Sequence, residues 1–393
     1  MTRGRHVRKL EAAQSRLWEK GRPLLQWLDL ELTERCNLDC QHCCVNLPAD
    51  DARAMKKELS LDRIRDILEQ AAGLGCLALR FTGGEPLLRD DFAEIYSFAR
   101  RLGMKVALFT NATLVTPRLA ELFAAIPPLE KIEVSLYGMR RESYEAVTRT
   151  PGSFAAAQRG LALLLENRIP LAVKSALLPA NRGEKKEFED WATVTVPGMK
   201  KPFTYAVFFD LRSRRDAPAK NRLIRSLRPS CRDGLAFITA KKDEYFEEMR
   251  RFCPTNLGVR TDRLFTCNAG LGTGTVDAYG RLQPCLPLRH PDAVMDLECR
   301  TLKSGLAEFF PKLREKKASG PEFLKRCAFC FLRGLCEQCP AKSWLEHGTL
   351  DTPVDYFCEL AQAQARFLGL LNGREKPWEV REWRKRLAIF AGS

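Results

Sequence analysis

Four cysteines lie close together near the start of the chain, in the stretch ERCNLDCQHCC at positions 34–44. Cys36, Cys40 and Cys43 have the spacing C-x3-C-x2-C, and Cys44 follows directly. A structural zinc site takes a closed set of four ligands, and a [4Fe–4S] cluster also has four corners. Three thiolates on such a cluster leave one iron open to a ligand from outside the protein.

A second group of cysteines lies in the C-terminal half, and the whole chain has 15 cysteines against 4 histidines. Its members are Cys267, Cys285, the run Cys327-x2-Cys330-x5-Cys336-x2-Cys339, and Cys358. Clustered cysteines without a secretory signal indicate metal binding rather than disulfides, and few histidines favour all-thiolate sites. A zinc ribbon stays open as an alternative, although its knuckles are usually about 15–20 residues apart.

Three further segments that can bind a ligand each follow an apolar, strand-like run: FTGGEP (81–86), FTNAT (109–113) and SLYG (135–138). Gly83 and Gly84 permit a close approach of the backbone to a ligand. Together with Glu85, the backbone groups there can hold the amine of a small zwitterion. No catalytic acid or base is assigned by the sequence.

The elements that must position these segments alternate along residues 27–210. Apolar runs with strand character lie at 28–32, 76–81, 105–109, 131–136, 170–177 and 203–209. Segments with helical periodicity lie between them, and we expect helices over 60–75, 89–103 and 153–168, capped by Ser60, by Asp90 or Asp91, and by Ser153. Strands alternating with helices indicate a parallel sheet, whose C-terminal strand ends carry the site. Six units are too few for an eight-stranded barrel, so we expect an open partial barrel or a doubly wound sheet.

The bulk properties narrow the class of protein. The 393 residues are 45% hydrophobic, enough for a large core, and the formal net charge is +15. The sequence contains no apolar run of about 18 residues, so it predicts no membrane-spanning helix. The basic N-terminus also lacks the apolar run of a secretory signal. We therefore expect a cytoplasmic protein with no membrane partner. The charge suits anionic ligands or an acidic peptide, and no nucleic-acid motif accompanies it, so nucleic acid is not the expected partner.

The chain resembles the radical S-adenosylmethionine (SAM) superfamily. The resemblance rests on CNLDCQHC at 36–43 and GGEP at 83–86, in this order on successive βα units. It implies that Cys36, Cys40 and Cys43 hold a [4Fe–4S] cluster whose open iron binds SAM. It also implies SAM contacts by His42, Gly83, Gly84, Glu85, Pro86, Asn111, Ser135 and Arg149. For His42 we expect stacking beside the adenine, and for Asn111 a role as a turn residue is an equal alternative.

The chemistry implied by this resemblance is radical chemistry. One electron, from a donor such as flavodoxin or ferredoxin, cleaves SAM to methionine and a 5′-deoxyadenosyl radical, which takes a hydrogen atom from the substrate. The cofactor carries this chemistry, while the protein positions the reactants and excludes water. Cys44 has no assigned duty.

The C-terminal cysteines resemble the SPASM extension, which implies two auxiliary [4Fe–4S] clusters and three clusters in all. Cys267, Cys285 and Cys339, with Cys253 as a candidate fourth ligand, would bind the first auxiliary cluster. Cys327, Cys330, Cys336 and Cys358 would bind the second. The chain departs from the family pattern in having two residues rather than three before Cys339.

The expected fold is a partial (β/α)6 TIM barrel followed by a small cysteine-rich α+β domain. We expect a basic helical extension over 1–26, the barrel over 27–210, a basic linker over 211–252, the SPASM domain over 253–370 and a basic C-terminal helix over 371–393.

Two segments resemble the peptide-modifying branch of these proteins, namely YEAVTRTPGSF and the later CEQCPAKSWLEHG. The expected substrate is therefore a ribosomally synthesised peptide or a protein side chain, which is crosslinked, epimerised or oxidised. Only about 26 residues precede the first strand, so a separate peptide-recognition protein is an expected partner. A tetrapyrrole or haem precursor, or another small molecule, is the alternative substrate. A zinc-binding scaffold or a nucleic-acid binder is the non-enzyme alternative.

Overall fold

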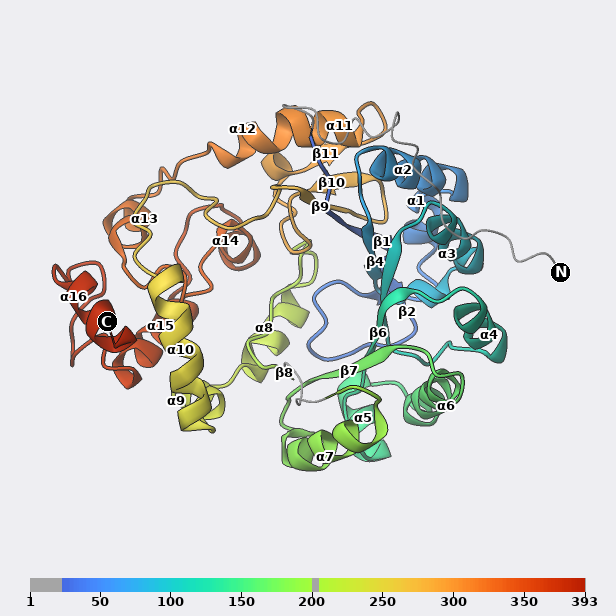
Figure 1. Ribbon diagram of the computed structural model, residues 1–393, viewed down its shortest axis with the longest axis horizontal. Helices are drawn as coiled ribbons and strands as arrows, with labels where there is room; N and C mark the ends of the chain where they lie inside the picture. The colour runs from blue at the N-terminus through green and yellow to red at the C-terminus, as the bar shows by residue number, and fades with distance from the viewer. Residues whose placement is uncertain (1–22, 200–204, 393) are drawn as a thin grey trace. The chain divides into compact units, whose positions relative to one another are not determined.

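The computed structural model describes residues 23–199 and 205–392, which form two compact units (Figure 1). The first unit comprises residues up to Ala206 together with Asn268–Leu286 and Ala293–Pro311. The second unit comprises Val207–Cys267, Pro287–Asp292 and the chain from Lys312 onward. Each unit is described by itself below.

A nine-stranded sheet forms the centre of the first unit, with the order β11-β10-β9-β1-β4-β5-β6-β7-β8. Six parallel strands of this sheet lie in chain order, and they are β1 (Trp27–Thr33), β4 (Ala78–Gly83), β5 (Lys105–Thr110), β6 (Leu129–Ser135), β7 (Leu171–Ala176) and β8 (Tyr205–Ala206). The predicted alternating run of six parallel strands is thus confirmed. The register pairs Asp29 with Arg80 and Glu133 with Ala172, so these side chains share one face of the sheet.

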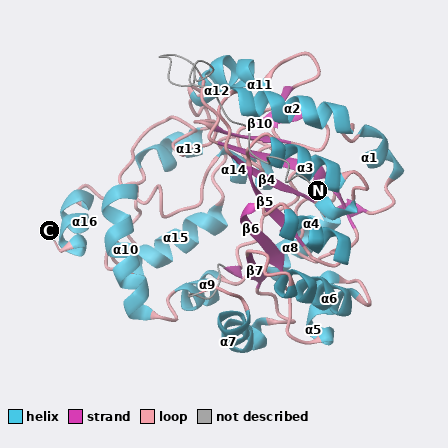
Figure 2. Ribbon diagram, turned by 45° about the vertical axis from the view of Figure 1, so that its right-hand side comes forward, coloured by secondary structure: helices cyan, strands magenta, loops and turns pink. Residues whose placement is uncertain are grey.

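Helices follow the strands and cover the outer face of this sheet (Figures 1 and 2). They are α1 (Ala52–Lys57), α2 (Leu61–Gly73), α3 (Phe92–Arg101), α4 (Pro117–Ala125), α5 (Arg141–Thr148), α6 (Ser153–Glu166) and α7 (Lys185–Thr195). The hydroxyl of Ser60 caps α2 by accepting from the Arg63 N–H, as predicted, and Asp91 is the N-cap residue of α3.

The predicted cap of α6 is wrong. Gly152, with φ 79°, is the N-cap residue, and Ser153 is the first helical residue. The Ser153 hydroxyl instead lies 2.8 Å from the hydroxyl of Thr148, with which it shares a hydrogen bond. A glycine is favoured at this left-handed position because it has no Cβ to clash with the backbone.

The two faces of β1 differ in chemistry. Leu28, Leu30 and Leu32 are at most 1% exposed and face the covering helices. Asp29 and Glu31 alternate with them and point to the opposite, inner face. The alternation therefore gives the sheet an apolar outer face and a polar inner face, on which a ligand can be bound.

The sheet continues past the predicted barrel. Strand β9 (Thr273–Val276) pairs with β1 in parallel, and β10 (Arg281–Gln283) and β11 (Met295–Asp296) add antiparallel strands. Helix α11 (Leu302–Ser304) and a π-helical turn follow. This corrects the expected boundaries, because most of 268–311 belongs to the first unit and not to the cysteine-rich one.

The second unit is mainly helical in the residues that the structure describes. Its helices are α8 (Pro218–Leu227), α9 (Cys231–Ile238), α10 (Lys242–Asn256), α13 (Pro321–Lys325), α14 (Pro340–His347), α15 (Asp355–Phe367) and α16 (Trp383–Ala391), while α12 (Phe310–Arg314) spans the boundary between the units. An apolar core joins α10, α15 and α16, and in it Phe331 stacks on Trp383 with ring centroids 6.2 Å apart.

Two further expectations about domains need correction. The stretch 211–252, expected as a linker, forms α8, α9 and most of α10, because apolar residues such as Ile224 and Met249 become buried at helical spacing. The expected C-terminal helix over 371–393 begins only at Trp383.

The N-terminal extension is described only in part. Of the expected helix over 1–26, residues 1–22 lie outside the described residues, and Leu25 and Gln26 donate backbone hydrogen bonds to Leu74 and Gly272 in a non-helical segment. No helix within 23–199 or 205–392 is both long and apolar enough to cross a bilayer.

Candidate functional site

The loop that carries the first three cysteines leaves the C-terminal end of β1. Two short strands, β2 (Arg35–Cys36) and β3 (Leu47–Pro48), close it at its base. Cys40 is buried, while Cys36 and Cys43 are partly buried. The Leu38 N–H donates to Cys36 Sγ at 3.4 Å, and the Asn46 N–H donates to Cys43 Sγ at 3.4 Å. Such donors stabilise negative charge on sulfur, as cluster ligands require.

The electrostatic setting of Cys36 favours a bound cation. Burial, together with charge on the nearby Glu85 and Cys43, raises the pKa of this thiol to about 12. A thiol in this setting stays protonated at neutral pH unless a metal replaces the proton. The residues therefore fit a [4Fe–4S] cluster, in which positively charged iron compensates the thiolates.

The cysteine loop is docked onto the C-terminal end of α5. The N–H groups of Asp39 and Gln41 donate to Thr148 O and Val147 O at 3.1 and 2.9 Å. Arg149, in the left-handed conformation with φ 53°, donates to Asp39 O at 3.2 Å and forms an ion pair with the Asp39 carboxylate. The structure thus gives Arg149 the role of holding the loop, and its SAM contact stays a prediction.

A buried ion pair supports the base of the loop. Arg35 donates from Nε and Nη2 to the two carboxylate oxygens of Glu58 at 2.8 and 3.0 Å, and both side chains are under 10% exposed. The Thr33 hydroxyl also donates to Glu58, and Arg89 lies 3.8 Å from it. Sequence reasoning missed this group, because no local pattern links partners that are 23 residues apart.

The Gly-Gly-Glu-Pro turn packs directly against the base of the same loop. The Gly84 N–H donates to Thr33 O at 2.7 Å, and the Glu85 N–H donates to Arg35 O at 2.9 Å. A Cβ on Gly83 would lie 2.0 Å from Thr33 O, and one on Gly84 would lie 2.1 Å from Arg35 O. The glycines are therefore required by the approach of two protein segments, and not only by a ligand as the sequence suggested.

Glu85 is fully buried at the centre of this arrangement. Its carboxylate accepts from Leu87 N, Thr110 Oγ1 and Asn111 N at 3.1, 2.8 and 2.7 Å. Burial raises its pKa to about 7, although these hydrogen bonds lower it. These three hydrogen bonds position the ends of β4 and β5 around Glu85. Its predicted contact with the SAM amine is not tested, and Pro86 begins a buried 3₁₀ turn.

Asn111 reaches from the end of β5 to the cysteine loop. Its Nδ2 donates to Asn37 Oδ1 at 3.0 Å and lies 3.8 Å from Cys36 Sγ, while its Oδ1 accepts from Thr113 N at 2.9 Å. Both readings of this residue therefore describe part of what it does. It makes a turn, and it also lies next to a predicted cluster ligand.

His42 and Ser135 meet at Tyr137, which sequence reasoning did not single out. The rings of His42 and Tyr137 lie edge to face, with centroids 5.0 Å apart. Burial raises the pKa of Tyr137 well above its ordinary value, and a hydrogen bond with Ser135 partly opposes this shift. The signal in the sequence was that Tyr137 is the aromatic residue of SLYG, one of the segments expected to bind a ligand.

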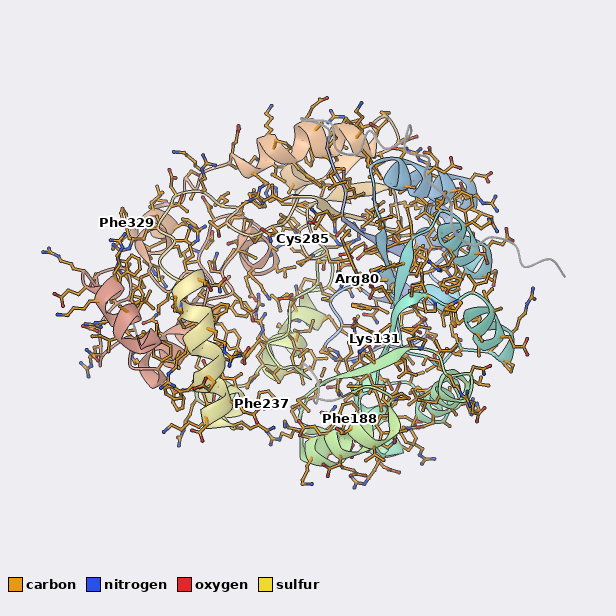
Figure 3. All side chains as sticks on the ribbon, viewed as in Figure 1. Arg80, Lys131, Phe188, Phe237, Cys285 and Phe329 are labelled. Atoms are coloured by element: carbon orange, nitrogen blue, oxygen red, sulfur yellow. The ribbon has the colours of Figure 1, made fainter. Side chains whose placement is uncertain are left out.

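Charged side chains and one aromatic ring line the inner face of the sheet below these loops. Arg80, which lies on the side of the sheet away from α2 and α3 (Figure 3), donates to Asp29 at 2.5 Å. The Arg80 guanidinium and the Lys174 ammonium lie 4.7 and 3.1 Å from the centroid of the Phe109 ring. Lys174 also pairs with Glu133 at 3.1 Å, and burial lowers its pKa. The inner face of the sheet therefore carries both positive and negative side chains that a polar substrate can contact.

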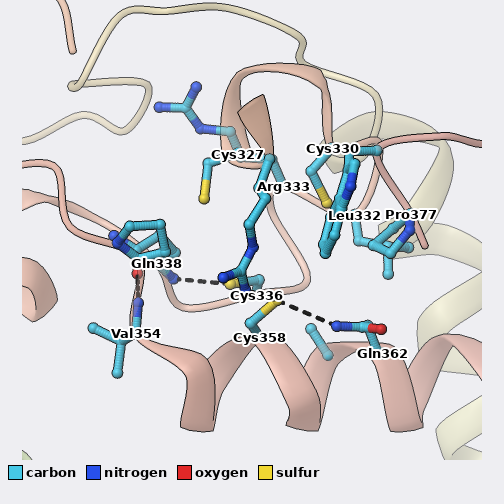
Figure 4. Close-up of a pocket in the computed structure, with 14 residues that line it drawn as sticks. Cys327, Cys330, Leu332, Arg333, Cys336, Gln338, Val354, Cys358, Gln362 and Pro377 are labelled. Carbon is cyan, nitrogen blue, oxygen red and sulfur yellow. Dashed lines mark hydrogen bonds between the residues drawn. The ribbon is translucent and has the colours of Figure 1, made fainter. Parts of the chain in front are cut away.

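In the second unit, four of the predicted ligands line one pocket. Cys327, Cys330, Cys336 and Cys358 turn toward a common space, as Figure 4 shows. The Gln338 N–H donates to Cys336 Sγ at 3.2 Å. Burial raises the Cys336 pKa well above its ordinary value, and charge on the other three thiols raises it as well. Their number and arrangement fit a cluster with four thiolate ligands.

The ligands predicted for the first auxiliary cluster are brought together less completely. Cys267 and Cys339 both belong to the second unit, and charge on Cys267 raises the Cys339 pKa, which burial already raises. Cys285 follows β10 in the first unit, so its sharing of a cluster with them stays a prediction. Cys253 lies fully buried in the apolar core with Tyr245 and Met249, so its part as a fourth ligand stays a prediction.

In the described part of the chain, no three or more His, Cys, Asp or Glu side chains converge as ligands of a single metal ion do. In an iron–sulfur cluster, by contrast, each cysteine binds a different iron.

Comparisons with known proteins agree with this geometry. Residues 30–192 match the model of the radical SAM superfamily. The chain is 27% identical over 344 residues to an AdoMet-dependent heme synthase of Methanosarcina barkeri, covering 83% of this chain and 93% of that protein. It is 34% identical over 144 residues to the mycofactocin maturase MftC of Mycolicibacterium smegmatis, covering 37% of this chain and 35% of that protein.

Among solved structures, the fold is similar to that of Streptococcus suis SuiB bound to S-adenosylmethionine. The TM-score is 0.63 at 16% identity, with 86% of this chain and 77% of SuiB covered. The likeness extends beyond the matched domain and includes most of both units.

The matched domain also decides between the two classes of protein that the sequence left open. It belongs to a family of enzymes, so the alternatives of a zinc-binding scaffold and of a nucleic-acid binder are set aside. The chain is an enzyme that carries a radical SAM domain over residues 30–192, and that family uses a [4Fe–4S] cluster and S-adenosylmethionine.

Proposed function

We propose that the chain abstracts a hydrogen atom from a ribosomally synthesised peptide or a protein side chain, and so crosslinks, epimerises or oxidises it. The observation that carries this proposal is the fold likeness to SuiB, which covers 86% of the chain and includes a structure of SuiB with its precursor peptide SuiA. The local identity to MftC, named a maturase, supports the same substrate class.

In this proposal Cys36, Cys40 and Cys43 hold the cluster that binds SAM. When bound, the cluster and SAM supply the one-electron cleavage that yields methionine and a 5′-deoxyadenosyl radical. Glu85 fixes the loops around the SAM site through its three accepted hydrogen bonds. His42 and Tyr137 form an aromatic wall beside it, and such a wall excludes water from a reactive site.

The inner face of the sheet supplies the substrate contacts in the same proposal. Phe109 provides an apolar surface between the cations of Arg80 and Lys174. The carboxylates of Asp29 and Glu133 pair with these cations. A peptide backbone or a polar side chain can exchange hydrogen bonds with such paired charges without leaving a buried charge unpaired.

The proposal requires two partners. A separate recognition protein would deliver the peptide, and a donor such as flavodoxin or ferredoxin would supply the electron. Four thiols in one pocket of the second unit support an auxiliary cluster there, and the first auxiliary cluster remains part of the proposal through Cys267, Cys285 and Cys339.

Anaerobic reconstitution with iron and sulfide tests the proposal. We expect dithionite and SAM to yield 5′-deoxyadenosine. With short deuterated peptides encoded beside the gene, we expect deuterium in that product and a peptide that has lost two hydrogens or inverted a centre. Loss of deuterium transfer with every such peptide, while SAM cleavage persists, would contradict the peptide assignment.

A second candidate substrate is a tetrapyrrole with carboxylate side chains. It is favoured by the relative named AdoMet-dependent heme synthase, whose similarity covers 83% of this chain, and by the net charge of +15. The matching experiment supplies iron coproporphyrin with SAM and dithionite. Release of carbon dioxide together with 5′-deoxyadenosine would replace the peptide proposal.

A further inference from the structure

Arg333 is a buried cation that lines the pocket of Cys327, Cys330, Cys336 and Cys358. The residue is 8% exposed. In Figure 4 its side chain lies among the four cysteines, which come from the 327–336 segment and from α15. Nothing in the sequence motif, which consists of cysteine spacings, assigns a task to this position.

The guanidinium of Arg333 is held by neutral groups. Its Nη1 donates to Thr261 O at 2.7 Å, and its Nη2 donates to Arg263 O at 2.6 Å and Leu264 O at 3.4 Å. The ring of Phe323 lies 5.2 Å from it. Within the described parts of the chain, no carboxylate forms an ion pair with this guanidinium.

A buried charge without an opposite charge is costly, because neutral dipoles replace only part of its hydration. Burial accordingly lowers the pKa of Arg333, and ionised Cys327, Cys330 and Cys336 are the groups that oppose this shift. A [4Fe–4S] cluster with four thiolates is net negative, and it gains one further negative charge on reduction. Such a cluster would supply the missing anion.

Arg326 provides an internal contrast. Its Nη2 donates to Cys358 Sγ at 3.5 Å, but the same group pairs with Asp355 at 2.8 Å. Its side chain is also 21% exposed. The charge of Arg326 is therefore largely compensated by a carboxylate and by solvent, whereas the charge of Arg333 faces the cysteines alone.

We propose that Arg333 is the fixed counter-charge of a [4Fe–4S] cluster bound by Cys327, Cys330, Cys336 and Cys358, and that it raises the reduction potential of this cluster. The inference rests on the proposed auxiliary cluster. A fixed positive charge stabilises the reduced form more than the oxidised form, because the reduced form carries more negative charge. The three carbonyl bonds hold the guanidinium in place, so little reorganisation accompanies electron uptake.

The test is a redox titration of the reconstituted full-length enzyme, followed by electron paramagnetic resonance. The signal of the pocket cluster is identified as the one lost in Cys336→Ala. In Arg333→Gln we expect the ratio of reduced to oxidised cluster at a fixed potential to fall at least tenfold, which is about 59 mV for one electron. In Arg333→Lys, which keeps the charge, we expect the ratio to stay within about threefold of the parent.

Arg215→Gln is the matched control. Arg215 also donates to two main-chain carbonyls, Trp344 O and Leu345 O at 2.7 Å, and lies 5.5 Å from an aromatic ring, but it does not line the pocket. We expect this variant to leave the ratio unchanged.

Unchanged potentials in Arg333→Gln would overturn the inference, and so would equal shifts in the Gln and Lys variants, because packing and not charge would then be responsible. If the Gln variant binds no pocket cluster, an intact cluster in Arg333→Lys supports the inference and its loss there overturns it. Failure of the auxiliary cluster itself is recognised separately, since Cys336→Ala would then keep the iron content of the parent.

Discussion

The three-cysteine loop of the first unit and the four-cysteine pocket of the second unit present thiols in opposite ways. Cys36, Cys40 and Cys43 lie on one short loop that follows β1, and burial, with charge on the nearby Glu85, raises the pKa of Cys36. The pocket gathers its thiols from two separate segments and places arginines among them. Burial raises the pKa of Cys327 to about 11, and charge on Arg326 and Arg333 partly opposes this shift.

This difference suits two tasks. A loop with three thiols leaves one iron for SAM, and an acidic setting disfavours added electrons on the cluster, so that a reduced cluster there is a strong reductant. A pocket with four thiols closes the cluster, and a basic setting favours added electrons. In the proposed function, the first site would therefore be a strong reductant that cleaves SAM, and the second would be suited to receive electrons.

The largest effect that separates the two regions is expected from removing their thiols. In the triple variant Cys36→Ala, Cys40→Ala, Cys43→Ala we expect 5′-deoxyadenosine formation to fall by more than about 1000-fold, because these three thiolates are proposed to hold the cluster whose open iron binds SAM. The assay is anaerobic reaction with SAM and dithionite, with iron counted per chain. The matched control, Cys327→Ala with Cys336→Ala, should lose iron but cleave SAM at a rate within about tenfold of the parent. Equal losses of SAM cleavage in both variants would contradict the assignment of SAM cleavage to the three-cysteine loop alone.

The next effect concerns how the loop is built. In Gly84→Ala the added Cβ would lie 2.1 Å from Arg35 O, which is main chain and cannot rotate away. We expect a loss of at least about 3 kcal/mol in unfolding free energy, or a displaced loop that retains no cluster. Gly73→Ala is the control, because nothing lies within 4 Å of its added Cβ on α2, and it should be neutral or stabilising by up to about 1 kcal/mol. Urea unfolding and iron content measure both variants, and a cluster-replete Gly84→Ala enzyme of parental stability would contradict the close approach.

Glu85→Gln tests the buried acid that distinguishes the loop from the basic pocket. The amide N–H of the glutamine would face a backbone N–H that now donates to the carboxylate. We therefore expect the unfolding free energy to fall by about 1–3 kcal/mol at neutral pH. The pKa of about 7 lies above the ordinary 4.5, so the folded protein binds this proton more tightly than the unfolded chain does. The unfolding free energy of the parent should therefore fall as pH rises from about 5 to 7, by about 3 kcal/mol at most, and this slope should vanish in the variant. If parent and variant share the same pH dependence of the unfolding free energy, that dependence arises from another titrating group.

Much of the loop region could be predicted from the sequence, because it depends on local signals. The strand runs, the Ser60 cap and the order of cysteines and glycines on successive βα units were all readable as patterns, and the six parallel strands confirm them. The strands β9 and β10 were missed, since three or four residues carry too little periodicity to predict a strand.

The charges around both regions could not be predicted for a different reason. Arg35 with Glu58, and Arg333 with the carbonyls of 261–264, are tertiary pairs with no spacing rule that would join them. Cys253 shows the converse case, because its place in a cysteine-rich segment suggests a ligand while the fold surrounds it with apolar side chains. Cysteine spacing thus predicts which thiols act together, but only the fold shows what charge surrounds them.

The smallest expected effect decides what Arg149 does for the loop. It forms its ion pair with Asp39 while 44% exposed, and such pairs contribute only about 0.2–1 kcal/mol. In Arg149→Met we therefore expect a stability change below about 1 kcal/mol and an unchanged KM for SAM, but a faster loss of iron to a chelator, as in Asp39→Asn. If Arg149 contacts SAM as the resemblance implies, the KM of Arg149→Met for SAM rises about tenfold or more, since a lost charged hydrogen bond costs about 1.5–3 kcal/mol. In that case Asp39→Asn leaves the KM for SAM unchanged. Because the two variants remove opposite ends of one pair, parallel behaviour means that Arg149 holds the loop, and divergent behaviour means that it binds the cofactor.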